Sequence, residues 1–436
     1  MPTVNETKLQ WFNPHRYPVV DEMSSLCDTI LTVVTNFESN ERCPYELRRQ
    51  RPRFDTASRP DKTNFKLLVE SFVCDLTHTH LLYGDQFTLV NRTDRVLAAK
   101  SRYRPTYFGR NFKHLIDILA DPSLDLIEQI KGEQRTETTE GFTTMIKPTD
   151  RFIGMMDKKD LNLDSMARRP DEEIVVLRDS RKGADSDFRD RVDYPETDDT
   201  RALRADVRSI NDYLEGADIT FDSDALKFGE KIDPTNRRLS RYYTYSSFDM
   251  GGRLFGGWWQ MLSRDTRQAG IKLDGEKTVS LDYSQMALRL TYASLGVAPS
   301  DDDGYTLPHL EKFRPGVKKL FNAMLFPRPA SWRLSVPRRI KRLLPDSWTD
   351  RQLIDAVKRQ HPELESVWYT DIGHRTQNVE SNILVKVLLA CQEIGISALP
   401  IHDAIMVPES RAEAAQAIME NVFEDTTGLI GLVETE

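Results

Sequence analysis

Two aspartates lie within apolar runs that are otherwise typical of core strands. Asp403 stands in the run ALPIHDAIMVP beside His402, and Asp282 stands in the run TVSLDYS. An ionised carboxylate is costly to bury without a cation, and two neighbouring carboxylates repel each other. A pair of Mg²⁺ ions, with Mn²⁺ as an alternative, satisfies both carboxylates and leaves positions free for phosphate. The two runs predict a two-metal centre that activates an attacking hydroxyl and stabilises a leaving pyrophosphate. The alternative is two unrelated aspartates at strand ends.

A basic segment lies between the two aspartates. In RPGVKKLFNAMLFP, the residues Arg314, Lys318, Asn322 and Phe326 fall four positions apart. On a helix this spacing produces one slowly drifting stripe, and a proline is tolerated in the first turn. The two cations stand at the N-terminal end, where backbone N–H groups also favour anions. The segment therefore predicts a helix that binds a triphosphate.

The positive charge continues beyond this helix. The chain carries a net charge of −8, yet residues 312 to 345 contain no acidic residue. Such a stretch in an acidic protein indicates a polyanion site, although a solvated basic face is the alternative. The residues that we expect to contact nucleic acid here are Arg333, Arg338, Arg339, Lys341 and Arg342.

These segments resemble the motifs of a known enzyme family, in the same order. LDYSQMALRL resembles motif A of the family A DNA polymerases, the Arg-x3-Lys-x7-Phe stripe resembles motif B, and IHDA resembles motif C. Motif C is His-Asp-Glu in that family and His-Asp-Ser in the phage-type single-subunit RNA polymerases. FDMGGRLFGGWWQ resembles the Arg-Gly-Arg segment of those RNA polymerases, and HRTQNVES resembles the helix that precedes motif C. The resemblance covers residues 240 to 408.

The resemblance implies roles for the residues that match. Asp282 and Asp403 are the metal ligands, with the Tyr283 carbonyl as a candidate third ligand. Arg314 and Lys318 hold the phosphates, and Lys318 protonates the leaving pyrophosphate.

Further matches concern the incoming base and the nucleic acid. Phe326 is expected to stack on the base of the incoming nucleotide. His402 is expected to contact the primer end, and Gln377 and Arg253 are expected to contact the duplex. The partners implied are a nucleic acid template and primer, together with nucleoside triphosphates.

The departures from the family pattern concern the nucleotide sugar. Tyr283 and Ala287 are both expected in the nucleotide site. Ala287 replaces the glutamate that excludes ribonucleotides in family A DNA polymerases. Phe326 replaces the tyrosine with which RNA polymerases hydrogen-bond the 2′-OH. The change at Ala287 predicts tolerance of ribonucleotides, and the change at Phe326 predicts no strong preference for them. The missing glutamate and the small size of the chain favour a primase-like role. Pro327 replaces the usual glycine, so the helix of motif B is expected to end differently.

The resemblance implies an α+β protein with a right-hand polymerase fold. We expect an antiparallel palm sheet in residues 241–436 and small, reduced fingers helices at about 305–375. Residues 1–240 are expected to form a helical, accessory or thumb-like region. Hydrophobic spacing predicts a helix around Val207 and Ile210 and another that stops at Gly395, and a capping box of Ser410 and Glu413 predicts the last helix.

Composition excludes some classes and leaves two alternatives. The chain has 436 residues, four scattered cysteines and no apolar stretch long enough for a membrane span, which favours a cytoplasmic protein without a membrane partner or disulfide framework. One alternative is an HD-type phosphohydrolase, named for a pair like His402-Asp403, but that class needs further histidine ligands. The other is a non-catalytic nucleic-acid-binding protein on a polymerase-like fold. The oligomeric state is not indicated by the sequence.

Overall fold

The computed structural model describes residues 9–40, 43–44, 46–48, 59–133, 141–179, 191–300, 302–327 and 335–435. The chain divides into two compact units: unit 1 comprises Met1–Glu173 and Lys231–Thr235, and unit 2 comprises Ile174–Glu230 and Asn236–Glu436. This boundary differs from the division expected at residue 240. Residues 174–230 group with unit 2 because their helix and strands pack against and pair with later elements of that unit.

Unit 1 combines short strands with helices. Its four-stranded sheet has the order β1-β3-β5-β4, in which β1 and β3 are parallel and the other pairs are antiparallel. The strands are β1 (Gln10–Trp11), β3 (Thr88–Val90), β5 (Thr144–Pro148) and β4 (Ile127–Ile130), with β2 (Arg16–Pro18) and β6 (Met166–Arg168) as a separate pair. The helices are α1 (Asp21–Glu38), α2 (Arg59–Tyr83), α3 (Asp94–Ala98), α4 (Asn111–Leu119) and α5 (Asp150–Met156).

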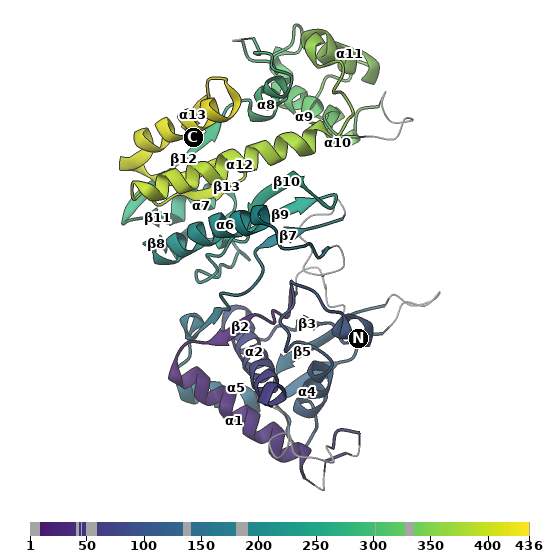
Figure 1. Cartoon of the computed structure of the whole chain (residues 1–436), viewed down its shortest axis with the longest axis vertical. Helices are drawn as coiled ribbons and strands as arrows, with labels where there is room; N and C mark the ends of the chain where they lie inside the picture. Colours follow the sequence, from purple (N-terminus) through teal and green to yellow (C-terminus); the bar gives the residue numbers. More distant parts are fainter. Residues whose placement is uncertain are drawn as a thin grey trace. The chain divides into compact units, whose positions relative to one another are not determined.

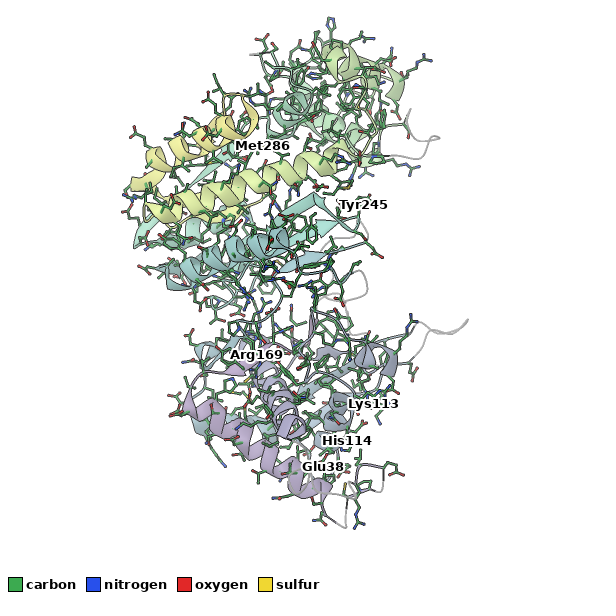
Figure 2. The ribbon with its side chains drawn as sticks, viewed as in Figure 1. Glu38, Lys113, His114, Arg169, Tyr245 and Met286 are labelled. Carbon is green, nitrogen blue, oxygen red and sulfur yellow. The ribbon has the colours of Figure 1, made fainter. Side chains whose placement is uncertain are left out.

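The core of unit 1 is built on aromatic rings. The ring of Phe12 lies 4.7 Å from that of Phe112 and 5.6 Å from that of Phe108, between centroids. Aromatic pairs at such spacings add to the free energy gained by burying their area. The end of α1 carries a buried carboxylate, Glu38, and the Nε2 atom of His114 on α4 lies 2.7 Å from its Oε1 atom (Figure 2).

Unit 2 contains an antiparallel sheet of the kind that the sequence predicts. Its order is β13-β14-β12-β11-β8, with β15 pairing β12 as well. The strands are β8 (Ile219–Phe221), β11 (Ile271–Leu273), β12 (Glu276–Tyr283), β13 (Leu399–Ile401), β14 (Ala404–Pro408) and β15 (Val433–Thr435). A second sheet joins β7 (Val175–Leu177), β9 (Ser240–Thr244) and β10 (Ser247–Phe255). The mixed fold with an antiparallel sheet is as expected, and the right-hand arrangement stays a prediction.

The helices of unit 2 cover these sheets and form a separate cluster. They are α6 (Asp198–Gly216), α7 (Arg264–Gly270), α8 (Met286–Ser294), α9 (Arg314–Met324), α10 (Arg338–Lys341), α11 (Asp350–Gln360), α12 (Ile372–Glu393) and α13 (Ala412–Thr427). The long helix α12 contacts α6, α8, α13 and β10, and Figure 1 shows it running between α13 and the β9–β10 hairpin. As expected, α12 stops at Gly395, whose φ of +70° suits a glycine.

Helix α9 packs by its apolar side within a cluster around α8 and α11. The side chains of Val317, Leu320 and Met324 are buried there, at helical spacing. The cap predicted for the last helix is wrong: Arg411 is the N-cap of α13, and the Ser410 hydroxyl donates to Glu276 of β12, 2.9 Å away. None of the described helices combines the length and apolar character needed to cross a membrane.

Candidate active site

Strand pairing brings the two aspartates to the same end of the antiparallel sheet. Asp282, near the end of β12, pairs with Ala404, the first residue of β14. Asp403 immediately precedes Ala404, in the two-residue turn that joins β13 to β14. Directly opposed residues of antiparallel strands have Cα atoms about 4.5 to 5.5 Å apart. Two segments far apart in the sequence therefore place their carboxylates at neighbouring positions.

Both aspartates are only partly buried, which differs from the buried setting expected from the apolar runs. The runs predicted burial because their neighbours are apolar, and those neighbours are indeed in the core: Leu281 and Ile405 are fully buried. The aspartates themselves lie where the strands end and are partly exposed, although the Oδ1 atom of Asp282 is buried. This position suits a binding site better than a core position does.

His402 holds the first position of the turn with a φ of +60°. This left-handed conformation is uncommon for non-glycine residues, although histidine adopts it more readily than most. The residue as a whole is exposed, and its ring lies 6.0 Å, between centroids, from that of Phe255 at the end of β10. Partial burial and the positive charge of Arg253 lower the pKa of His402, against the opposing effect of Asp403.

Arg253 lies on β10 and forms a fork with Glu380 of α12. Its Nε donates to Oε1 over 2.7 Å and its Nη2 to Oε2 over 3.0 Å. The Glu380 side chain is 5% exposed and that of Arg253 is 29% exposed. The sequence predicted that Arg253 contacts the duplex, and the structure shows that two of its donors are already engaged.

Gln377 lies one turn before Glu380 on α12 and is partly exposed. The preceding turn carries His374, which is buried and has rings on two sides. The centroid of its ring lies 4.9 Å from that of Tyr245 and 4.7 Å from that of Phe326. The first turns of α12 thus place Gln377 close to the residue predicted to stack on a base.

The two cations of α9 differ in their surroundings. Arg314 donates to Asp303, with Nη2 to Oδ1 at 3.2 Å, and this carboxylate raises the pKa of Arg314. Burial alone would raise the pKa of Asp303, but the hydrogen bonds from Arg314 and Thr306 lower it. Lys318 is exposed, and in the described part of the chain it has no ion-pair partner. A phosphate therefore meets a free Lys318 and an Arg314 that is shared with Asp303.

Phe326 lies beyond the end of α9, which stops at Met324. The predicted stripe is therefore helical only as far as Asn322, and the early end agrees with the effect expected of Pro327. The Phe326 ring packs closely against Gly373 at the start of α12: a Cβ atom at that glycine would lie 2.7 Å from its Cζ atom. Burial of the ring edge against α12 holds it in place.

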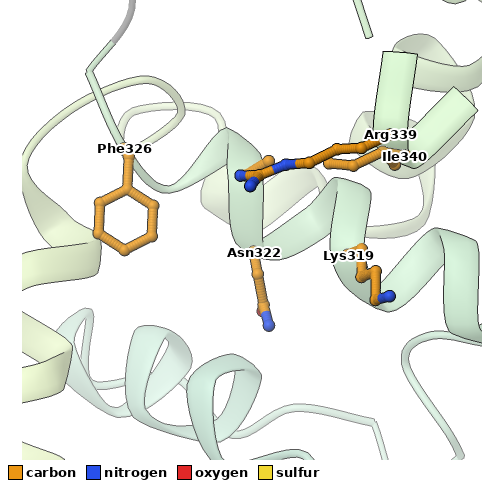
Figure 3. A pocket seen from close by; sticks show the side chains of 6 residues that line it. Lys319, Asn322, Phe326, Arg339 and Ile340 are labelled. Carbon is orange, nitrogen blue, oxygen red and sulfur yellow. The ribbon is translucent and has the colours of Figure 1, made fainter. Parts of the chain in front are cut away.

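A cavity of about 370 Å³ opens beside Phe326 (Figure 3). Lys319, Asn322 and Ala323 of α9 line it together with Arg339 and Ile340 of α10. In the view of Figure 3, Asn322 lies between Phe326 and Lys319. The side-chain oxygen of Asn322 is buried and has no hydrogen-bond partner among the described residues. An aromatic ring, an amide and two cations are the groups that a phosphorylated heterocycle requires.

The basic residues after the cavity divide into three groups. Arg338, Arg339 and Arg342 are exposed on and beside α10. Lys341 instead forms an ion pair with Asp350, at 3.4 Å, and bonds to the Trp348 carbonyl. Arg333 lies outside the described residues.

The two remaining nucleotide-site residues follow Asp282. The Tyr283 side chain points into the core, where its hydroxyl donates to the Met419 carbonyl over 2.6 Å. Any contact of Tyr283 with a ligand would therefore involve its backbone. Ala287 lies in the first turn of α8 and is partly exposed.

Sequence reasoning missed two residues of this region, Asp303 and Glu380, and gave no individual role to Lys319 or Asn322. Asn322 was recognised only as part of the stripe. A signal existed for Glu380, because a single carboxylate stands on the apolar face that also carries Ile383 and Val387. No comparable signal marks Asp303, whose pairing with Arg314 depends on the path of the intervening loop.

The donor set at the sheet end fits a magnesium ion that a substrate completes. Within the described ranges there is no group of three or more His, Cys, Asp or Glu side chains that could hold a metal. Two carboxylates at adjacent strand ends are nevertheless what Mg²⁺ commonly takes from a protein, because phosphates and water supply its remaining ligands. Asp282 and Asp403 would hold the ion.

Comparison with known proteins gives little further guidance. No family model matches the chain, and no curated protein matches it. Among solved structures, the chain is similar to the POL domain of Pol1 from M. smegmatis, which was determined in complex with a DNA primer-template and dNTP. The TM-score is 0.27 at 13% sequence identity, covering 54% of this chain and 50% of that one. The chain thus spans about half the length of that structure, and so low a score supports no conclusion about fold or activity.

Proposed function

We propose that this protein is a template-directed nucleotidyltransferase, a compact polymerase with a primase-like tolerance of ribonucleotides. The observation that carries the proposal is the register of β12 on β14, which sets Asp282 beside the turn that holds Asp403. The same unit holds α9, with the cations Arg314 and Lys318. Paired carboxylates and a phosphate-binding helix are the parts that phosphoryl transfer needs.

The reaction proposed is attack of a 3′-hydroxyl on the α-phosphate of a nucleoside triphosphate, with release of pyrophosphate. Two Mg²⁺ or Mn²⁺ ions, held by Asp282, Asp403 and the Tyr283 carbonyl, would supply activation of the hydroxyl and charge stabilisation of the leaving group. The protein's part is to hold these ligands at one strand end and to position the triphosphate.

The residues of α9 bind and orient the triphosphate. Lys318 binds the phosphates directly and donates a proton to the departing pyrophosphate. Arg314 also binds the phosphates. Because its guanidinium is paired with Asp303, a bound triphosphate takes the place of that carboxylate. Phe326, at the cavity beside α9, supports the base of the incoming nucleotide by stacking.

Exposed groups around this centre bind the nucleic acid. Arg338, Arg339 and Arg342 neutralise backbone phosphates, which contributes affinity without sequence preference. His402 contacts the primer end, and Gln377 contacts the duplex. Arg253 also contacts the duplex, through the guanidinium nitrogen that does not donate to Glu380. The implied partners are a template, a primer and nucleoside triphosphates in the cytoplasm.

The two alternatives receive less support. A phosphohydrolase centre requires additional histidine ligands, and the His374 ring instead packs between the rings of Tyr245 and Phe326. A non-catalytic nucleic-acid-binding protein would have no need of two aspartates at adjacent strand ends. The phosphohydrolase alternative also leaves the cations of α9 unexplained.

Nucleotide incorporation on a labelled primer–template tests the proposal. Asp282→Asn and Asp403→Asn should each lower the rate by about 1000-fold or more, a barrier increase of about 4 kcal/mol. The double variant should be no worse than either single one, because the two residues act as a unit.

The control is Asp346→Asn, which removes an exposed carboxylate of the same unit and should leave incorporation unchanged. Binding of the primer–template, measured by fluorescence anisotropy, should persist in all variants. Near-normal incorporation by either single aspartate variant would refute the two-metal assignment.

A further inference from the structure

Glu380 is the single buried carboxylate of unit 2 among the described residues. Both of its oxygens accept hydrogen bonds from Arg253, and its side chain is 5% exposed. Fork-like pairing of this kind fixes the direction of a guanidinium as well as its charge. Glu380 is therefore unavailable to a metal or a substrate, and its effect must pass through Arg253.

The backbone beneath this pair is fixed by further hydrogen bonds between α12 and β10. The Asn378 amide donates to the Phe248 carbonyl over 2.9 Å, and the Ser381 hydroxyl bonds to the Gly252 carbonyl. Arg241, itself buried, donates to the same Gly252 carbonyl over 2.9 Å. Glu380 stands between these anchored positions on α12, so its carboxylate has little freedom to move.

Arg253 faces the turn that carries Asp403. Residues 253 to 255 of β10 pair regularly with β9, so Arg253 and Phe255 lie on the same face of the strand. The Phe255 ring contacts that of His402, at 6.0 Å between centroids. Burial alone would lower the pKa of Arg253, but Glu380 raises it; burial raises the pKa of Glu380 against the opposing effect of Arg253. The charge of Asp403 adds a smaller increase to both pKa values.

A guanidinium at this place has two carboxylates within electrostatic reach, Glu380 and Asp403. Without a fixed partner it would turn to Asp403, because a partly buried cation is stabilised by a neighbouring carboxylate. That new pair would cancel the charge of Asp403 and occupy its oxygens. Outer partners of this kind commonly set metal affinity even though they never touch the ion.

We propose that Glu380 is a positioning residue that holds the Arg253 guanidinium away from Asp403, and so keeps the Asp403 carboxylate available to a divalent cation. This inference rests on the proposed function, because it takes Asp282 and Asp403 as the cation ligands. It adds a requirement for cation binding that lies outside the motifs of Asp282 and Asp403, namely the ion pair of Arg253 with the buried Glu380.

Binding of Mn²⁺ to the full chain, followed by electron paramagnetic resonance without nucleotide or nucleic acid, tests the proposal. Glu380→Gln should weaken Mn²⁺ binding by about 10-fold to 100-fold, because it releases Arg253 towards Asp403. Arg253→Gln should not weaken binding, since it removes the competing cation. The double variant should bind within a few-fold of the unmodified protein.

This pattern separates positioning from a structural role. If the pair only stabilised the fold, both single variants would weaken binding and the double variant would not recover. The matched control is Asp117→Asn, which breaks the similar fork between Arg92 and Asp117 in unit 1, with bonds of 2.7 and 2.8 Å, and should leave Mn²⁺ binding unchanged.

Should Glu380→Gln fail to fold, as judged by circular dichroism, Glu380→Asp replaces it, and its shorter carboxylate should give an intermediate loss. Unchanged binding in the folded Glu380 variant would overturn the proposal. Failure of the proposed function gives a different result from failure of this inference. If Asp282 and Asp403 were not the cation ligands, Asp282→Asn and Asp403→Asn would leave Mn²⁺ binding of the otherwise unmodified chain intact.

Discussion

Ala287 stands in the first turn of α8, four residues after the strand position of Tyr283. The turn before it is held by Gln285, whose side-chain oxygen accepts a hydrogen bond from the Gly304 backbone over 2.9 Å. The helix start is therefore fixed, and the reach of the residue at position 287 depends only on its side chain. The methyl group of Ala287 packs in part against the apolar cluster around α8, α9 and α11, and it projects less far than the glutamate of the family pattern would.

The short side chain of Ala287 predicts weak discrimination between sugars. Exclusion of a 2′-OH needs an obstacle, and preference for it needs a hydrogen-bond partner; Ala287 is too short for the first and Phe326 lacks the second. Incorporation efficiencies for rNTPs and dNTPs should differ by less than about 100-fold, or roughly 3 kcal/mol. Ala287→Glu should shift the balance towards dNTPs.

Competition between the two substrates in one extension reaction measures this ratio. Ala293→Glu, at another partly exposed position of the same helix, serves as the control and should leave the ratio unchanged. Strict exclusion of rNTPs by the unmodified protein would show that another residue supplies the obstacle.

At the scale of elements, the junction between the end of α9 and the start of α12 shapes the cavity. The backbone N–H of Gly373 donates to the Leu325 carbonyl over 3.0 Å, and the Phe326 ring covers the glycine. The two helices approach so closely that no Cβ fits between them without moving the ring. Glycine is required here by contact, since its backbone conformation is an ordinary helical one.

Gly373→Ala should therefore destabilise the protein, by about 1 to 3 kcal/mol from overpacking. The usual effect of alanine in a helix has the opposite sign, about 0.5 to 1 kcal/mol of stabilisation. Urea unfolding measures the difference. Gly216→Ala is the matched control, because a Cβ there meets nothing within 4 Å, and it should stabilise. A stabilising Gly373→Ala would contradict the packing described.

Local sequence patterns predicted the helices better than the side-chain contacts between distant segments. The helix α9 and the stop of α12 follow from apolar spacing, a tolerated proline and a glycine, which act within a few residues. The cap at Ser410 was wrong because its hydroxyl bonds to Glu276, far away in the sequence. The pairs of Arg314 with Asp303 and of Arg253 with Glu380 were missed for the same reason: each depends on where a distant segment is brought by the fold.

At the scale of the molecule, the chain passes between the two units at residues 173–174, 230–231 and 235–236. The short segment Lys231–Thr235 belongs to unit 1, although its neighbours on both sides belong to unit 2. Nothing in its composition sets it apart, so the sequence placed the whole stretch up to residue 240 in one region. Side-chain contacts with α2 and β2 join this segment to unit 1.

Asp233 provides those contacts. Its Oδ2 atom lies 2.7 Å from Nε2 of His78 and 3.7 Å from Nη2 of Arg16. Its Oδ1 atom accepts hydrogen bonds from the backbone and hydroxyl of Thr235, at 3.1 and 2.6 Å. Arg16 also donates to Asp75 of α2 over 3.0 Å. The returning segment is thus held to unit 1 by a largely buried group of charges.

This arrangement predicts a pH dependence of stability. Burial alone would raise the pKa of Asp233, but the hydrogen bond and charge of His78, with Thr235 and Arg16, lower it from 3.8 to about 2. Because the pKa is lower in the folded state than in the unfolded one, the stabilisation is complete above about pH 4. It is lost as the pH falls through 2. A shift of this size corresponds to about 2 kcal/mol.

Urea unfolding of the unmodified protein and of Asp233→Asn, at steps from pH 6 to pH 2, measures this contribution. The difference in unfolding free energy should be about 2 kcal/mol larger at pH 6 than at pH 2, because the carboxylate is protonated at the lower pH and no longer attracts its partners. Asp171→Asn removes an exposed carboxylate of the same unit and should show a difference that does not change with pH. If the difference for Asp233→Asn also stayed constant across the range, the charge of Asp233 would have no part in holding the returning segment, and only its hydrogen-bonding shape would matter.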